Sequence, residues 1–234
     1  MIARRIPTIL PQMSREESLE VTKIYSVCGL LKEGSGLVQE RPFRSPHHTI
    51  SVSAMVGGGR NPMPGEITLG CHGCLFIDEI SELPKCHCST SDISRYLKKL
   101  SMPFIDRMDL CVEAPRVAFE ELTGNTGGET SLKIREEVLC AHQIQAERYL
   151  GTSYRFNADV KGSHAEEYFR VGGAQKRLLE DAFESLNLTA RSYHKILKVA
   201  RTIADLDEEE QISEIHISEA IGYRMIDEKY WGKE

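Results

Sequence analysis

The chain has 234 residues, a length that fits one large domain or two small ones. Its net charge of -6 excludes a surface built as a whole to hold nucleic acid, so any DNA contact must come from a local patch or loop. No apolar run approaches the roughly 18 residues of a membrane helix, and the N-terminal segment is no secretory signal. Without such a signal, the odd count of seven cysteines predicts reduced thiols in a cytoplasmic protein that does not contact a membrane.

The first predicted elements are a helix, a loop-rich region and a strand. Residues 14–17 (SREE) form a capping-box pattern, and apolar residues follow at helical spacing up to Gly29. Residues 33–73 are rich in Gly, Pro, Ser and His, which predicts loops and a hairpin. The apolar run 75–77 then predicts a short buried strand with acids at its C-terminal end.

The remainder of the chain is predicted to be helical. Residues 124–128 (GNTGG) form a plausible linker, and four apolar stripes at helical spacing follow it. We therefore expect an α/β first domain over 1–124 and an all-helical second domain over 125–234.

The acids after the strand, Asp78 and Glu79, match the Walker B arrangement of nucleotide-hydrolysing proteins. In that arrangement the Asp holds Mg²⁺ against the phosphates and the Glu polarises the attacking water. The strand should be apolar because it lies inside a parallel sheet that is covered on both faces. Taken alone the pattern is weak, because a solvated strand end gives the same letters.

Longer stretches of sequence support the Walker B interpretation. The stretch RPFRSPHHTISVSAMVGGGRNPMPGEITLGCHGCLFIDEISELP resembles the magnesium-chelatase-like AAA+ ATPases, and within them the ComM/YifB group. RYLKKLSMPFIDRMDLCVEAP and LNLTARSYHKILKVARTIADL are also typical of that group. The resemblance covers nearly the whole chain and implies an incomplete AAA+ (P-loop NTPase) parallel-sheet core followed by an all-helical lid.

The resemblance implies roles for individual residues. Asp78 matches the Mg²⁺-coordinating acid and Glu79 the catalytic acid. Arg107, in FIDRMDL, matches the arginine finger that reaches the γ-phosphate bound by the neighbouring subunit. Arg191, in LTARSYHK, matches the sensor-2 arginine at the start of a lid helix. Without the resemblance, Arg107 would be expected in a surface ion pair with Asp106 or Asp109, and Arg191 in solvent.

The Gly- and Pro-rich stretch before the strand resembles the helix-2 insertion of this group, a hairpin that points into the pore of a ring. Arg60 lies at its predicted tip and is the candidate contact to DNA phosphates. The alternative for Arg60 is an ordinary solvated loop arginine.

Two parts of the family pattern are missing. The sequence contains no G-x-x-x-x-G-K-[ST] phosphate-binding loop, and Met1 falls about where the residue after that loop would stand. In addition, Lys85 runs directly into CHCSTSD, although relatives continue there through the strand that ends in the sensor-1 asparagine.

The second gap bears on a zinc site. Cys86 and Cys88 match the second half of a four-cysteine set whose first half falls in the missing segment. Tetrahedral zinc needs four converging ligands, and Cys71 and Cys74 would complete the count, with His72 or His87 as substitutes. Because the gap creates this proximity, the sequence favours a Walker B site beside half of an unrelated cysteine cluster, and zinc is the less favoured alternative.

The resemblance implies a ring, a hexamer in intact relatives, that hydrolyses ATP with Mg²⁺ to translocate on DNA or drive its branch migration. The missing loop leaves three alternatives open. The chain could be a catalytically inactive pseudo-ATPase or interaction fragment, a small zinc-binding module, or a magnesium-chelatase subunit of tetrapyrrole synthesis.

Overall fold

The computed structural model describes residues 2–31, 34, 36–47, 50–58, 62–78, 108–112, 128–186 and 188–231. The chain divides into two compact units, which we describe separately. The first comprises residues 1–86 with 129–136, and the second comprises 87–128 with 137–234. The predicted boundary between residues 124 and 125 stays a prediction.

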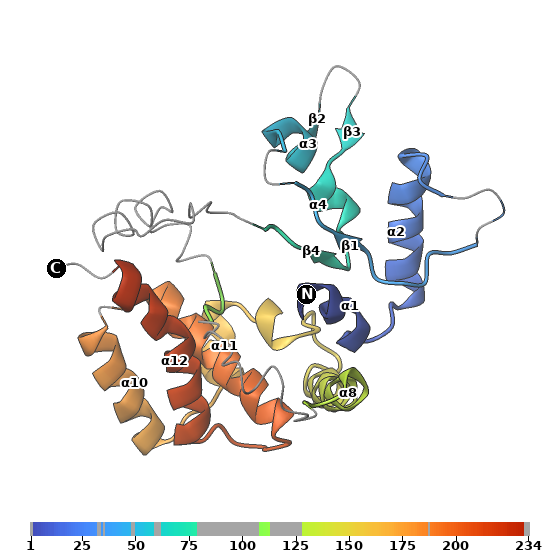
Figure 1. Ribbon diagram of the computed structural model, residues 1–234. Coiled ribbons are helices and arrows are strands. Elements are labelled where there is room, and N and C mark those ends of the chain that lie inside the picture. Colours follow the sequence, from blue (N-terminus) through green and yellow to red (C-terminus); the bar gives the residue numbers. More distant parts are fainter. Residues whose placement is uncertain are drawn as a thin grey trace. The chain divides into compact units, whose positions relative to one another are not determined.

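Short elements make up the first unit (Figure 1). Its longest helix, α2, begins as predicted after Ser14, whose side chain accepts a hydrogen bond from the Glu17 amide at 3.1 Å. The Glu17 carboxylate accepts one from the Ser14 amide at 2.9 Å, so the capping box is complete. The elements are η1 (Ile2–Arg5), α1 (Ile6–Ile9), α2 (Arg15–Val27), β1 (Phe43–Arg44), α3 (Val52–Val56), β2 (Gly57–Gly58), β3 (Met63–Pro64), α4 (Glu66–Leu69) and β4 (Cys74–Leu75).

Two small sheets are present among the described residues. β1 pairs in parallel with β4, and β2 pairs antiparallel with β3, which confirms the predicted hairpin. The expectation of a buried strand at residues 75–77 is wrong. Leu75 is only half-buried and Ile77 is 38% exposed, because the described pairing with β1 does not by itself cover the faces of β4, which takes helices packed on the sheet.

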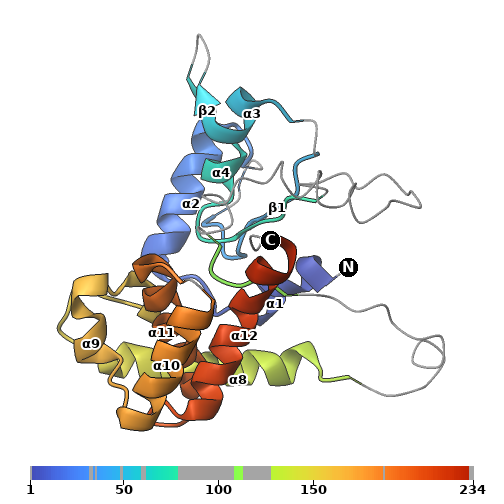
Figure 2. The same ribbon diagram turned by 90° about the vertical axis from the view of Figure 1, so that its left-hand side faces the viewer.

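The second unit is helical, as predicted. Figure 2 shows α10, α11 and α12 packed side by side. Phe169, Leu179, Ile196 and Ile217 are almost fully buried between its helices, and each contributes about 1.5–3 kcal/mol by burial. The described elements are α8 (Ser131–Arg148), whose residues 131–136 belong to the first unit, η2 (Asn157–Asp159), η3 (Gly162–His164), α9 (Ala165–Tyr168), α10 (Gly173–Ser185), α11 (Ala190–Leu206) and α12 (Glu214–Trp231).

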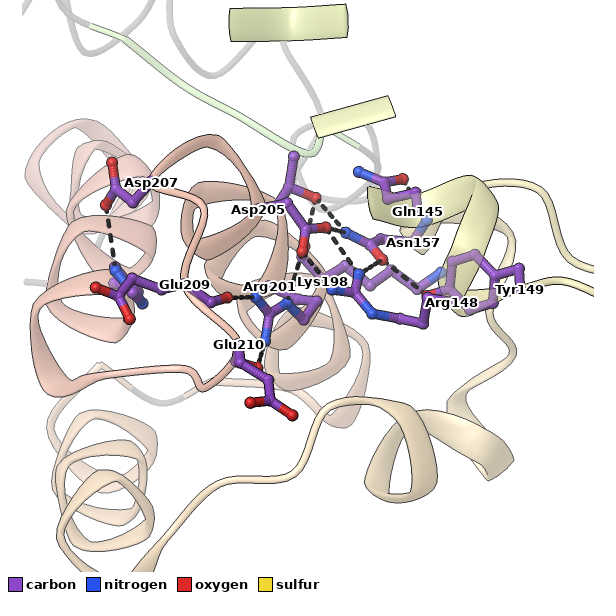
Figure 3. A network of polar contacts seen from close by, with 12 residues as sticks. Gln145, Arg148, Tyr149, Asn157, Lys198, Arg201, Asp205, Asp207, Glu209 and Glu210 are labelled. Carbon is purple, nitrogen blue, oxygen red and sulfur yellow. Dashed lines mark hydrogen bonds and ion pairs between the residues drawn. The ribbon is translucent and has the colours of Figure 1, made fainter. Parts of the chain in front are cut away.

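A polar network around Asp205 lies inside this unit (Figure 3). Asp205 is fully buried and forms ion pairs with Arg148 and Arg201. The Asn157 amide donates a further hydrogen bond to it at 2.8 Å. Arg201 also donates to the carbonyl oxygens of Glu209 and Glu210. The network thus ties the end of α8, η2, α11 and the loop after α11 together.

Tyr149 extends this network and should make the unit sensitive to alkali. Its hydroxyl donates to the Asn157 side chain at 2.8 Å, and burial raises its pKa from 10.0 to about 12. A raised folded-state pKa gives stability that is complete below pH 10 and is lost as the pH rises towards 12. The loss should approach roughly 2–3 kcal/mol.

We therefore expect the free energy of unfolding to fall less steeply over this pH interval in Tyr149→Phe than in the wild type. Urea titrations followed by circular dichroism at several pH values measure this difference. Parallel curves for the two proteins would contradict the assignment.

Candidate nucleotide site

Asp78 lies three residues beyond β4, at the C-terminal edge of the parallel pair. Two hydrogen bonds extend the pairing: the Cys74 amide donates to the Pro42 carbonyl, and the Phe76 amide donates to the Arg44 carbonyl, both at 2.8 Å. The side chain of Asp78 is exposed. An exposed carboxylate at this edge can reach a Mg²⁺ ion that also binds phosphates and water. Glu79 lies outside the described residues.

The strand beside β4 is locked in place by an ion pair. Arg44 in β1 donates two hydrogen bonds to the Glu66 carboxylate in α4, each 2.6 Å long. These bonds raise the pKa of Arg44 and lower the pKa of Glu66. Arg44 therefore acts as a structural cation in this unit, since its guanidinium is already held by a bidentate carboxylate.

The hairpin before the strand depends on glycine. Gly57 has φ = 95°, and a Cβ there would lie 2.7 Å from the Met63 carbonyl oxygen. This backbone shape therefore requires glycine. Residues 59–61, which include the candidate DNA contact Arg60, lie outside the described residues, so that assignment stays a prediction.

Arg191 is the second residue of α11, at the start of a helix as predicted. The helix begins at Thr189, whose side chain accepts a hydrogen bond from the Ser192 amide at 3.1 Å. Arg191 is exposed and lines a cavity of about 830 Å³ with two more cations of α11, Lys195 and Lys198. Acids also line the cavity: Asp109 pairs with Lys195, and Asp207 and Glu219 contribute further carboxylates. Arg191 is the cation in the first turn of α11, where the helix N-terminus favours phosphate.

The segment 108–112 is anchored to the same helical unit. The Met108 carbonyl accepts hydrogen bonds from Lys195 at 2.8 Å and from Arg224 at 2.7 Å. Asp109, which the surface alternative paired with Arg107, lies 3.1 Å from Lys195. Sequence reasoning missed Lys195 and Arg224 as anchors, although Lys195 lies one helical turn beyond Arg191. Arg107 itself is outside the described residues.

Asp78 and Arg191 belong to different units, so the structure places each only within its own unit. The described cysteines near the strand, Cys71 and Cys74, are half-buried free thiols, and burial raises the pKa of both. Cys86 and Cys88 lie outside the described residues. In the parts of the chain that the structure describes, no helix is both long and apolar enough to cross a membrane.

Comparison with models of protein families shows to which family the chain belongs. The model for magnesium chelatase, subunit ChlI, matches residues 1–85 and again 82–122, and the model for the ChlI C-terminal region matches residues 128–224. The chain therefore belongs to the magnesium chelatase ChlI family, as the sequence resemblance indicated.

Curated relatives align along most of the chain. Competence protein ComM of Haemophilus influenzae is 36% identical over 97% of this chain and 53% of its own length. YifB of Salmonella typhimurium is 35% identical over 97% of this chain and 54% of its own length. Rv2897c of Mycobacterium tuberculosis is 32% identical over 88% of this chain and 50% of its own length. The chain thus spans about half the length of these relatives.

The comparisons also support the prediction that a segment present in relatives is missing after Lys85. The two matches to the ChlI model meet at residues 82–85, next to the junction that the sequence indicated after Lys85. The alignment with ComM runs over 278 positions, more than the 234 residues of the chain. The relative therefore carries residues that have no counterpart here.

Proposed function

We propose that the chain supplies the acid-bearing strand and the lid of a ComM-type AAA+ ATPase. The observation that carries the proposal is the position of Asp78 directly beyond a parallel strand, inside the segment that matches the ChlI model. The position of Arg191 as the second residue of α11 supports it, because the family resemblance expects a lid arginine at the start of a helix. In this proposal residues 1–124 form an incomplete AAA+ core and residues 125–234 the lid.

The residues present suit Mg²⁺ and ATP. Mg²⁺ is usually bound by one or two carboxylates together with phosphates and water, and the exposed Asp78 can serve as one of them. When bound, the ion would neutralise charge on the phosphates. Glu79 would orient and polarise the attacking water, and Arg191 would contact the phosphates from the lid. Arg107 would stabilise charge at the site of the neighbouring subunit.

The proposed assembly is a cytoplasmic homo-oligomeric ring, a hexamer, that moves on DNA and drives branch migration. One relative is a competence protein by name, which favours a role in DNA uptake. The hairpin β2–β3 would face the pore and bring Arg60 to the DNA backbone. A single cation per subunit suffices for a contact that reads no sequence, because a ring repeats it.

A chimera tests these roles. The phosphate-binding loop and the segment missing after Lys85, both taken from ComM of Haemophilus influenzae, are added to this chain, and ATP turnover is measured with and without DNA. We expect turnover that falls at least 100-fold in Glu79→Gln and Arg107→Ala, whereas the nearby Glu82→Gln retains it. Arg60→Ala should reduce only the stimulation by DNA.

A chimera that assembles into rings but turns over no ATP would contradict the proposal. Turnover that Glu79→Gln leaves unchanged would contradict the assigned role of that residue.

A second candidate is a pseudo-ATPase that keeps an interaction surface without using nucleotide. The two candidates differ in whether this chain binds Mg-ATP.

A further inference from the structure

Three side chains with metal-binding atoms converge in the first unit, away from Asp78. Glu20 projects from α2, and Cys71 and His72 come from the turn that follows α4. One ligand atom from each residue lies within 4.8 Å of the other two. The closest pair is the Glu20 carboxylate and Nε2 of His72, 2.8 Å apart. A carboxylate, a thiol and an imidazole in one place are ligands that zinc accepts.

The turn that carries His72 is held in an unusual backbone conformation. His72 has φ = 56°, a left-handed value that few residues other than glycine adopt. Its carbonyl oxygen accepts a hydrogen bond from Arg41 at 2.7 Å, and Arg41 also donates to the Pro11 carbonyl at 2.6 Å. These bonds help to fix the turn whose conformation presents the imidazole to Glu20.

A second carboxylate lies behind the imidazole. Oε1 of Glu17 is 3.8 Å from Nδ1 of His72, on the side of the ring opposite Glu20. Glu17 is itself held by the capping box of α2. Metal-binding histidines commonly donate their second ring N–H to such a carboxylate, which fixes the tautomer and the ring orientation. At 3.8 Å Glu17 is beyond hydrogen-bond distance of this nitrogen, and a shift of a few tenths of an ångström would let it act as the positioning residue of a metal site.

Charge favours a divalent ion at this position. A Cys71 thiolate and the Glu20 carboxylate together balance two positive charges, and neutral His72 adds none. Arg41 lies beside the cluster, but its own charge is balanced by Glu17, 3.4 Å away. A divalent ion would therefore meet no uncompensated positive charge from Arg41, which Glu17 neutralises.

We propose that Glu20, Cys71 and His72 form a zinc site in which water completes a tetrahedral set of ligands. The bound ion joins α2 to the turn that leads into β4, and so fixes the strand that carries Asp78. The proposed ligands do not include Cys86 or Cys88, which lie outside the described residues. The site does not depend on nucleotide binding.

Zinc titration of the purified full-length chain under reducing conditions, in competition with a chromophoric chelator, tests the site. We expect one zinc per chain, with an affinity that falls at least tenfold in Glu20→Gln, Cys71→Ser and His72→Asn. Glu16→Gln and Cys28→Ser are matched controls in α2 and at its C-cap, and both should bind as the wild type does. Co²⁺ should show thiolate charge-transfer absorption that is lost in Cys71→Ser.

The double variant Cys86→Ser/Cys88→Ser separates the two cysteine sites. Wild-type zinc affinity in this variant supports the proposal, and its loss would overturn the three-residue site. Unchanged affinity in Glu20→Gln would overturn it as well. That variant should remain folded, because the Glu20 side chain is 60% exposed.

Discussion

Asp205→Ala should lower the free energy of unfolding of the helical unit by about 3–5 kcal/mol. Asp205 is completely buried, and both Arg148 and Arg201 form ion pairs with it. Removing the carboxylate would leave two guanidinium groups without their buried counter-charge, and the Asn157 amide would lose one of its two acceptors, keeping only Thr202. Because the network joins α8, η2 and α11, the loss should reach all three elements.

Urea unfolding followed by circular dichroism measures this change. Asp181→Ala, at an exposed position of α10, is the matched control and should alter the free energy of unfolding by less than about 0.5 kcal/mol. If the free energy of unfolding of Asp205→Ala lies within about 1 kcal/mol of the wild-type value, the substitution acts like an ordinary surface change. The network would then contribute little to stability.

The second large effect is expected from Gly73→Ala in the first unit. A Cβ at this position would overlap the Pro42 carbonyl oxygen and lie 2.8 Å from its carbonyl carbon. The obstacle is backbone, so a side-chain rotation cannot relieve it. The Cys74 amide would have to leave the Pro42 carbonyl, and β4 would separate from β1. We expect a loss of about 3 kcal/mol or more and a displacement of Asp78.

Gly36→Ala provides the control, because no atom lies within 4 Å of a Cβ built there. That variant should be as stable as the wild type or slightly more stable. Thermal unfolding of both variants measures the difference. Equal melting temperatures for Gly73→Ala and the wild type would show that β1 and β4 are not packed as closely as described.

Local patterns predicted the elements that depend on local chemistry. The capping box of α2 was predicted from four letters because its hydrogen bonds join residues three positions apart. The glycines around residue 57 predicted the hairpin, and the helical spacing after residue 131 predicted the helical unit. Burial of the strand at 75–77 was predicted wrongly, because burial depends on neighbouring strands and not on the apolar run itself.

Long-range polar contacts left no signal in the sequence. Asp205 lies between Ala204 and Leu206 in a helical stripe, and nothing near it indicates Arg148, 57 positions away. Glu20 and His72 are 52 positions apart, so the sequence indicated neighbouring cysteines and histidines as metal-binding partners of Cys71 but not Glu20.

Asp78 follows a parallel strand and Arg191 lies at a helix start, as the sequence indicated. Their roles in a nucleotide site stay predictions. Glu79, Arg60, Arg107, Cys86 and Cys88 stay predictions because they lie outside the described residues.

Equilibrium binding of a fluorescent ATP analogue with Mg²⁺ to the purified chain tests most directly whether it retains a nucleotide site. We predict saturable binding with a Kd of about 1 mM or tighter, weakened at least tenfold in Asp78→Ala and in Arg191→Ala. Asp159→Ala, at a capping position remote in sequence from both, should bind as the wild type does. The account would be contradicted, and a pseudo-ATPase favoured, if no binding were seen at nucleotide concentrations several times this Kd. Binding that Asp78→Ala leaves unchanged would contradict it as well.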